Sequence, residues 1–380
     1  MPDRTTCPGL SRRRFLTAAA ASLRAPAPAS PVSIARCLDY GPALSPALKT
    51  IFDQLGGLSR LVAGKTVSIK INLTGPPSMR MGTTPAEYAH YTHPAIIGAT
   101  VRLMGEAGAR RIRILEGCFS TPDPLPEFML DAGWDPMPLL NAAPAVEMVN
   151  TNLLGARRRY ARFNVPSGKG FIFPGFDLHP AYEECDVLVS IAKLKEHATC
   201  GITLAMKNMF GATPITIYGD AAAKDEPTDA GCRGGRGSIM HGGLRGPCRS
   251  APQELDRNTP RDDKYRMPRI VADIAAARPI HLSILDGIAT MAGGEGPWIR
   301  GPLKAVRPGI LVAGLNPVCT DAVGAAVMGF DPMAARGSAP FEDCDSTLLL
   351  AEQHGVGSRD LSRIEIAGLP ISQAVFRFRS

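Results

Sequence analysis

Short apolar runs rich in β-branched residues alternate along the chain with segments of helical periodicity. Runs of about four to eight apolar residues are typical of strands buried on both faces, and longer periodic segments are typical of helices. The predicted strands span residues 67–71, 111–115, 186–192, 280–285 and 310–313. The predicted helices span residues 95–107, 202–210, 267–277 and 318–328. This alternation predicts an α/β fold with a mostly parallel sheet and flanking helices.

Two regions interrupt the alternation. Residues 145–175 have the pattern of a β-hairpin, with the basic run Arg157-Arg158-Arg159 close to a turn at Gly155. Residues 219–265 are rich in Gly, Pro and charge, and they form a long Gly-rich insertion. A loop this long in a compact domain is usually functional or disordered. We therefore expect either a lid, with His241 as a ligand that arrives on closure, or a disordered surface insertion.

The N-terminal segment has the organisation of an export signal. It combines Ser11-Arg12-Arg13-Arg14-Phe15-Leu16 with a short apolar run and the small residues Ala27-Pro28-Ala29. A basic region, an apolar region and a small-residue cleavage site are typical of such signals, and the arginine pair indicates the twin-arginine route. We expect residues 1–29 to be a signal peptide read by the twin-arginine translocase, and the protein to be periplasmic or otherwise exported. The alternative is a disordered basic tail.

Residues 30–380 are then expected to form a single α/β unit of one or two lobes. No stretch reaches the ~20 uninterrupted apolar residues that cross a bilayer, so we expect no stable membrane span. The whole chain carries a net charge of +7, from 42 basic and 35 acidic residues. Residues 1–29 hold five arginines and one aspartate, so their removal would leave 37 basic and 34 acidic residues. A unit so close to neutrality gives no support to a nucleic-acid partner.

Nine cysteines occur in the chain, and Cys7 would leave with the signal peptide. No C-x-x-C pair occurs, so the cysteine spacing predicts no iron–sulfur cluster and no zinc ribbon. Cys185 and Cys319 lie in apolar stretches and are expected to be buried as small hydrophobic residues. Cys232 and Cys248 flank a Gly/Arg-rich loop, where a disulfide is one option in an oxidising compartment.

Polar and ionisable residues gather where the predicted strands end. In a parallel sheet, ligands bind outside the carboxyl ends of the strands. The residues at or just after these ends are Lys70, Asn72, His93, Glu116, Lys193, Lys195, His197, Lys207, Asn208, Asp286 and Asp321. Alternation with period two would put Lys193, Lys195 and His197 on one face if the chain stays extended. We expect these side chains to share one cleft.

Several lysines in one cleft would repel one another unless an anion neutralises them. We therefore expect a small anionic ligand, a carboxylate or a phosphate. The residues expected to bind it are Lys70, Asn72, Lys193, Lys207 and Asn208. The residues expected to be catalytic are His93, His197 and Lys195: the two histidines as the general acid–base pair, because imidazole titrates near neutral pH, and Lys195 to stabilise developing negative charge.

A divalent metal held by Asp286, Asp321 and His197 is the rival interpretation of the same cleft. The spacing shows no metal motif such as H-E-x-x-H, and no phosphate loop or nucleophile elbow occurs. Each residue also has a purely structural interpretation: a solvated lysine, a capping histidine or a paired carboxylate.

At these residues the chain resembles the family called domain of unknown function 362. The matching motifs are Lys70-Ile71-Asn72, Thr92-His93-Pro94, Asp186-Val187-Leu188-Val189, Lys193-Leu194-Lys195-Glu196-His197, Met206-Lys207-Asn208-Met209-Phe210-Gly211, Asp286-Gly287-Ile288 and Asn316-Pro317-Val318. The resemblance covers roughly residues 65–335, with the Lys-Leu-Lys-x-His motif as the most specific part. Some relatives carry a ferredoxin-type cluster segment, whose cysteines this chain lacks. The family is also remotely similar to nickel-pincer lactate racemases, which keeps α-hydroxy-acid chemistry as one option.

Two functions from different classes are consistent with these residues. The first is an exported enzyme that acts on a small anionic substrate by acid–base chemistry assisted by Lys and His. The alternative is a non-catalytic periplasmic binding or maturation protein for an anionic cofactor or a metal. A shared cleft is required by both.

Overall fold

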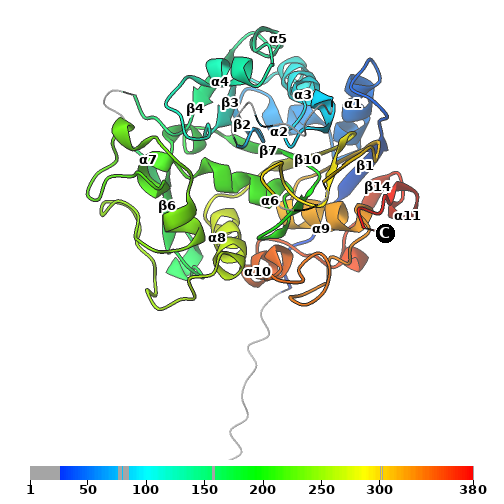
Figure 1. Cartoon of the computed structure of the whole chain (residues 1–380). Helices are drawn as coiled ribbons and strands as arrows, with labels where there is room; N and C mark the ends of the chain where they lie inside the picture. Colours follow the sequence, from blue (N-terminus) through cyan, green and yellow to red (C-terminus); the bar gives the residue numbers. More distant parts are fainter. Residues whose placement is uncertain are drawn as a thin grey trace, which may run out of the picture.

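The computed structural model describes residues 26–75, 79, 85–155, 159–299, 301 and 303–379. A sheet of eight strands, in the order β14-β1-β13-β10-β7-β2-β3-β4, runs through the molecule (Figure 1). The strands are β1 (Val32–Arg36), β2 (Thr66–Lys70), β3 (Arg111–Glu116), β4 (Val146–Asn150), β7 (Val187–Lys193), β10 (Leu282–Gly287), β13 (Ile310–Gly314) and β14 (Ile366–Gly368). Strands β10, β7, β2, β3 and β4 are parallel, so their carboxyl ends share one edge. Strand β13 is antiparallel to both of its neighbours, β10 and β1.

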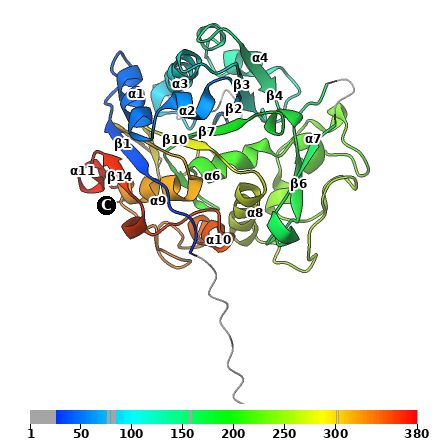
Figure 2. The ribbon, with the colours of Figure 1, turned by 180° about the vertical axis from the view of Figure 1, so that it is seen from behind.

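Helices cover both faces of the sheet (Figures 1 and 2). One face is covered by α1 (Leu44–Gln54), α2 (Leu58–Val62), α3 (Pro94–Glu106), α4 (Leu125–Asp131) and α5 (Met137–Leu140). The other is covered by α6 (Ala205–Asn208), α8 (Asp263–Ala277), α9 (Pro317–Val327) and α10 (Thr347–Gln353). Two hydrophobic cores lie on the two faces of the sheet. Along β7, Val187, Val189 and Ile191 pack in the core shared with α1 and α3, whereas Leu188 and Ala192 pack in the core shared with α8 and α9. This alternation makes the strand apolar throughout, because both of its faces are buried.

Short elements complete the chain. They are β5 (Ala161–Asn164), β6 (Gly175–Leu178), β8 (Glu196–His197), β9 (Gly201–Ile202), β11 (Thr290–Ala292), β12 (Lys304–Val306), α7 (Ile215–Tyr218), α11 (Ile371–Ala374), η1 (Ala86–Tyr88), η2 (Pro166–Gly168), η3 (Pro180–Tyr182), η4 (Met209–Ala212), η5 (Asp229–Gly231), η6 (Gly237–His241) and η7 (Leu361–Arg363). Across the part of the chain that the structure describes, no helix has the length and hydropathy needed to cross a membrane.

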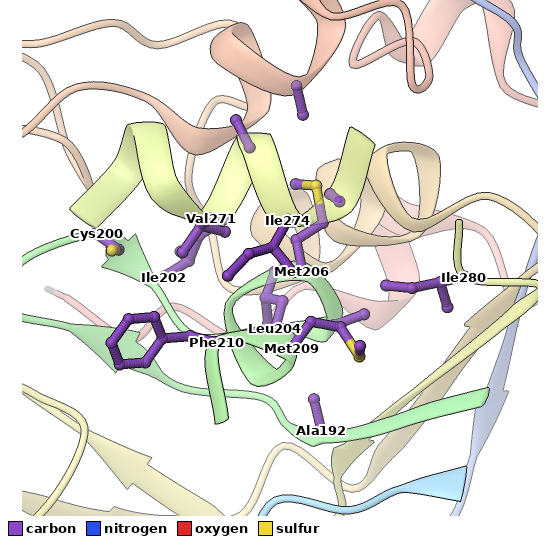
Figure 3. Packing of buried hydrophobic residues seen from close by; sticks show 14 of the residues in the cluster. Ala192, Cys200, Ile202, Leu204, Met206, Met209, Phe210, Val271, Ile274 and Ile280 are labelled. Carbon is purple, nitrogen blue, oxygen red and sulfur yellow. The ribbon is translucent and has the colours of Figure 1, made fainter. Parts of the chain in front are cut away.

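The α/β fold and the mostly parallel sheet are confirmed, but one predicted helix is wrong. Residues 202–210 begin in strand β9, and helix starts only at Ala205. The Asp321 carboxylate, from α9, accepts the backbone N–H groups of Ala205 and Met206 at 2.8 and 2.9 Å. These bonds fix the start of α6. Figure 3 shows Leu204, Met206 and Met209 packed between α8 and Ala192 of β7, so the segment is apolar on several sides and its pattern resembles that of a longer helix.

The two irregular regions also take definite structures. Within residues 145–175, β4 joins the main sheet beside β3, and only β5 and β6 pair as antiparallel strands. Arg157 and Arg158 lie outside the described residues. The insertion 219–265 includes η6, a turn of π-helix. Arg266 of α8 is fully buried and donates to the carbonyl oxygens of Ile239 and Met240 at 3.3 Å, so α8 holds this turn in place.

The start of the described chain touches the body of the fold. The predicted signal peptide lies outside the described residues except for 26–29. The carbonyl of Pro28 accepts the N–H of Ser358 at 2.8 Å, and the carbonyl of Ala27 accepts a bond from Arg363 at 2.8 Å. Cleavage after Ala29 would remove both contacts.

Candidate functional site

A cavity of about 400 Å³ lies at the carboxyl ends of β2, β3 and β7. It is closed by α6 and η4 on one side, by the insertion on another, and by the loop after β11. Six of the predicted substrate-binding and catalytic residues line it: Lys70, Asn72, Lys195, His197, Lys207 and Asn208. The structure therefore brings together most of the expected site.

Lys70 is a buried cation with a full set of partners. Its Nζ lies 2.5 Å from Glu116 Oε1 and donates to the Ile71 carbonyl at 2.7 Å. Burial raises the pKa of Glu116, while the Lys70 charge and the N–H groups of Leu73 and Gly117 lower it. Lys70 therefore contributes little unpaired charge to the cavity.

Asn208 and two glycines make the close packing around Lys70 feasible. Asn208 donates to the carbonyls of Lys70 and Ile191 and to Ser190 Oγ, at 3.0 to 3.3 Å, so its amide is used within the protein. A β-carbon on Gly211 would lie 2.9 Å from Lys70 Nζ. One on Gly117 would lie 2.3 Å from the Gly211 carbonyl oxygen. Gly211, the last residue of the Met-Lys-Asn-x-Phe-Gly motif, is thus explained by the close approach of its backbone to Lys70 and Gly117, which leaves no room for a side chain.

Lys207 is a cation of a different kind. Its Nζ lies 4.5 Å from the centre of the Phe210 ring, and Arg236 lies over the same ring at 5.6 Å. Among the described residues, Lys207 Nζ has no ion-pair or hydrogen-bond partner, and the Phe210 ring is its contact. Burial lowers the pKa of Lys207; Cys200 and the charge of Glu295 oppose this effect, and the charges of Arg236 and Lys70 add to it. Burial likewise lowers the pKa of Arg236 to about 10. Within the part of the chain that the structure describes, neither Lys207 nor Arg236 thus has a directly paired carboxylate, and Arg236 donates through Nε to the Thr213 carbonyl at 2.8 Å.

Two histidines face these cations. Burial holds the pKa of His197 well below its usual value, with Lys207 and Lys195 adding to the effect. The pKa of His241 is lowered to about 4 by burial and by the charges of Lys207 and Arg236. Both imidazoles are therefore neutral at pH ~7. His197 Nδ1 accepts the Thr199 N–H at 3.1 Å, which assigns the ring proton to Nε2.

Lys195 forms part of the cavity wall with its side chain fully buried. Its Nζ donates to the carbonyls of His90 at 2.9 Å and Glu295 at 2.7 Å. Burial lowers the pKa of Lys195 to about 7, against the opposing effect of the Glu295 charge. A neutral amine has two N–H groups, which match these two carbonyls, and it retains one lone pair. Near neutral pH, Lys195 can therefore accept a proton.

The structure does not place Lys193 and His93 in the cavity. Lys193 Nζ is bonded to Asp286 Oδ2 at 3.0 Å, to the Tyr40 hydroxyl at 3.1 Å and to the Glu87 carbonyl at 3.1 Å. His93 stacks on Tyr40, with ring centres 3.7 Å apart, and its Nδ1 caps α3 through the Ala95 N–H. Strand β7 ends at Lys193, so the expected alternation through Lys195 and His197 is interrupted.

The three residues expected to hold a metal are also kept apart. Asp286 is engaged by Lys193, Tyr40 and the His93 N–H, and Asp321 accepts two N–H groups of α6. Burial raises the pKa of Asp321 to about 7. Within the described residues, no group of three or more His, Cys, Asp or Glu side chains is arranged to hold a metal ion. Asp286, Asp321 and His197 thus do not form one site.

Glu116, which is expected in the cleft without an assigned role, also lines the cavity, and two further residues there are not assigned to the site from the sequence: Arg236 and Glu295. Glu295 Oε2 accepts the Ala198 N–H at 2.8 Å and lies 3.9 Å from His197 Nδ1. It belongs to the glycine-rich loop after β11, and Arg236 to the insertion. The sequence signal that could have identified Arg236 and Glu295 is the position of each charged residue within a glycine-rich segment.

Among the described residues, the cysteines form no disulfide bonds. All eight described cysteines are free and buried. The thiols of Cys232 and Cys248 donate separately, to the carbonyls of Thr121 at 3.1 Å and Ala223 at 2.9 Å. The suggested disulfide between them is not formed.

The fold and cavity define an α/β protein with a cavity at the carboxyl edge of its sheet. The chain matches the family described as "Domain of unknown function (DUF362)" over residues 67–326. Since this match covers more than half of the chain, the protein belongs to that family. The resemblance expected from the Lys-Leu-Lys-x-His and Met-Lys-Asn motifs is confirmed.

Similarity to individual proteins is lower. A "Thylakoid-associated protein" of Synechocystis sp. is 28% identical over 187 residues, which are 48% of this chain and 50% of that protein. The lactate racemase apoprotein from Thermoanaerobacterium thermosaccharolyticum has a TM-score of 0.37 and 12% identity, covering 73% of this chain and 54% of the racemase. A Thermotoga maritima protein of solved structure has a TM-score of 0.31 and 14% identity, covering 62% and 49% of the two chains. The chain thus spans about half the length of the relatives it matches.

Proposed function

We propose that the protein is an enzyme that binds a carboxylate or phosphate anion in this cavity and transfers a proton within the bound molecule. The observation that carries the proposal is the pair of cations Lys207 and Arg236, which lack a paired carboxylate among the residues that the structure describes and lie beside two neutral imidazoles. Desolvated cations without a carboxylate partner raise the energy of the empty site, and a bound anion offsets that cost.

The anion would lie against the end of the cavity formed by Phe210. Lys207 and Arg236 provide charge there, and His197 presents Nε2–H as a neutral donor. Lys70 would act indirectly, since its charge is matched by Glu116. Charged donors aimed at a site sheltered from water stabilise negative charge as it develops in a reaction.

Lys195 is the group best suited to accept the proton. Its pKa of about 7 leaves a large neutral fraction at neutral pH, and its two N–H groups are held by carbonyls. Because the side chain is buried, only a group inside the cavity can reach it. Removal of a proton by Lys195 would leave negative charge on the substrate, which Lys207 and Arg236 would stabilise.

Phosphate binding tests this proposal directly. Calorimetric titration of the purified protein with inorganic phosphate should show binding, and Lys207→Met should weaken it about tenfold or more. Lys304→Met is the matched control, because Lys304 is an exposed lysine on β12 and does not line the cavity. Equal weakening by both variants, or no binding to the unmodified protein, would contradict the proposal.

Binding without turnover would favour the non-catalytic alternative. Proton transfer is measured separately. A carboxylate that binds is incubated with the protein in deuterated solvent, and the replacement of its carbon-bound hydrogen by deuterium is followed. The enzyme interpretation predicts exchange that depends on Lys195 and follows an ionisation near pH ~7.

We further propose that the protein is exported by the twin-arginine translocase. Eight buried free thiols suit a protein that folds in a reducing compartment before export. Replacing Arg12 and Arg13 with Lys should retain the protein in the cytoplasm, because the receptor reads the arginine pair rather than charge alone. Cell fractionation measures this, and unchanged periplasmic recovery of the double variant would refute export by this route.

A further inference from the structure

The cavity is large for a bare phosphate or acetate ion. Its volume is about 400 Å³, within the range of roughly 300–1,000 Å³ typical of pockets for drug-sized ligands. A ligand of only four or five heavy atoms would leave most of this space to water. The side chains that line the rest of the cavity therefore indicate what the remaining part of the ligand is made of.

Aromatic and apolar side chains make up much of that lining. Phe119, Phe210, Met79 and Trp298 all border the cavity. Trp298 and Met79 are each 38% exposed, so both keep apolar surface that a ligand could cover. The polar head of a ligand and its body thus have separate surfaces available.

Trp298 is held in one position rather than left free at the surface. Its Nε1 donates to Glu295 Oε1 at 3.1 Å, and its ring meets the edge of His90 with centres 5.0 Å apart. A β-carbon on Gly75 would lie 2.6 Å from the indole, and one on Gly296 would lie 2.4 Å from it. The ring therefore packs directly on two stretches of backbone. A fixed aromatic ring loses little entropy when a ligand stacks on it.

The cations lie at the Phe210 end of the same cavity. Lys207 and Arg236 lie over the Phe210 ring, and His241 meets its edge with centres 5.5 Å apart. Trp298 is linked instead to Glu295, which lies beside His197. Trp298 and the two cations therefore contact different residues of the cavity wall.

Building on the proposed function, we infer that the ligand is an amphiphilic anion. Its carboxylate or phosphate group binds Lys207 and Arg236, and its aromatic or branched apolar body packs on Trp298. This names the substrate class more narrowly than a small anion: the apolar body contributes to affinity, and the charged group orients it.

A pair of ligands that share one head group tests the inference. Calorimetry with inorganic phosphate and with phenyl phosphate gives an affinity ratio for each protein. The unmodified protein should bind phenyl phosphate at least about tenfold more tightly, because the ring buries apolar surface. In Trp298→Ala this ratio should fall toward one. Trp134→Phe should keep the ratio, since Trp134 is buried against Tyr91 outside the cavity.

Fluorescence provides a second readout. The chain has two tryptophans, so Trp134→Phe leaves Trp298 as the sole indole reporter. Phenyl phosphate should change the emission of this variant, and inorganic phosphate should change it far less.

The outcomes separate this inference from the proposed function. A ratio near one, with phosphate binding that still depends on Lys207, would overturn the amphiphilic ligand and leave the anion site intact. A ratio that survives Trp298→Ala, or phenol that binds as tightly as phenyl phosphate, would also overturn it. If neither phosphate compound binds, the proposed function itself fails.

Discussion

Lys193 and Lys207 are both sheltered from water near the carboxyl edge of the same sheet, but their surroundings are opposite. Lys193 is fully buried and has Asp286, Tyr40 and the Glu87 carbonyl around its ammonium group. Lys207 has the face of Phe210 and the charge of Arg236 nearby. The first arrangement is complete within the protein, whereas the second has no paired carboxylate among the described residues. The partners of a lysine, more than its burial or motif, thus distinguish the structural role of Lys193 from the binding role proposed for Lys207.

The largest effect should come from breaking the complete arrangement. Lys193→Met would leave the Asp286 carboxylate buried without its cation, which costs about 3–5 kcal/mol of unfolding free energy. Urea unfolding of the ligand-free protein measures this loss. Lys304→Met, on exposed β12, should change stability by less than about 0.5 kcal/mol. A Lys193 variant as stable as this control would show that the pair is not structural.

An intermediate effect is expected from Lys195, and it depends on pH. The folded pKa is about 7, against an ordinary value of 10.5. Between these values the unfolded chain holds a proton that the folded protein lacks, so folding stability rises with pH over this window. Below about pH 7 both states are protonated, and the full cost of burying the charge is present.

Relative to Lys195→Met, the unmodified protein should therefore gain up to about 1.4 kcal/mol per pH unit above pH ~7. Urea unfolding of both proteins at several pH values between ~6 and ~9 measures the difference. Parallel curves for the two proteins would mean that Lys195 keeps its ordinary pKa in the fold. The proton-transfer role would then lose its physical basis.

The smallest effect, opposite in sign to the first, should come from Lys207. Removing one of two neighbouring cations relieves repulsion, so Lys207→Met should stabilise the ligand-free protein by up to about 1 kcal/mol. The same variant should lose the rise in melting temperature that phosphate produces. Thermal unfolding with and without phosphate measures both. A lower melting temperature with the phosphate effect retained would place Lys207 with Lys193, as a structural cation.

Much of this site could be predicted from strand ends alone. Lys70, Asn72 and Lys195 meet because parallel strands bring their carboxyl ends to one edge, and that rule needs only the apolar pattern. The separation of Lys193 from Lys195 was not predictable in the same way. It depends on where β7 stops, and Asp286 on the neighbouring strand provides a partner directly opposite Lys193.

Histidine roles were harder to assign from sequence. His93 has the local pattern of both a catalytic residue and a helix cap, and only its stacking on Tyr40 separates the two. His241 reaches the cavity because Arg266 fixes the π-helical turn through hydrogen bonds to the Ile239 and Met240 carbonyls. Arg266 follows Met240 by 26 positions and Ile239 by 27, and no local sequence pattern indicates contacts over that separation. Loops that bind through long-range contacts carry little periodic signal. Whether the insertion also opens as a lid stays a prediction.

The hydrogen bonds from α6 to Asp321 couple the position of α6 to that of α9, although the two helices are far apart in the sequence. Helix α6 has four residues and no side-chain cap of its own, so its position is set by a carboxylate 115 positions later. A change in α9 that moves this carboxylate would move Lys207 with it, although α9 itself does not border the cavity. In a mutational survey, such variants would register as binding defects far from the ligand. Substitutions at position 321 or within positions 205–208 alone should impair binding, whereas matched substitutions in both segments should be tolerated better.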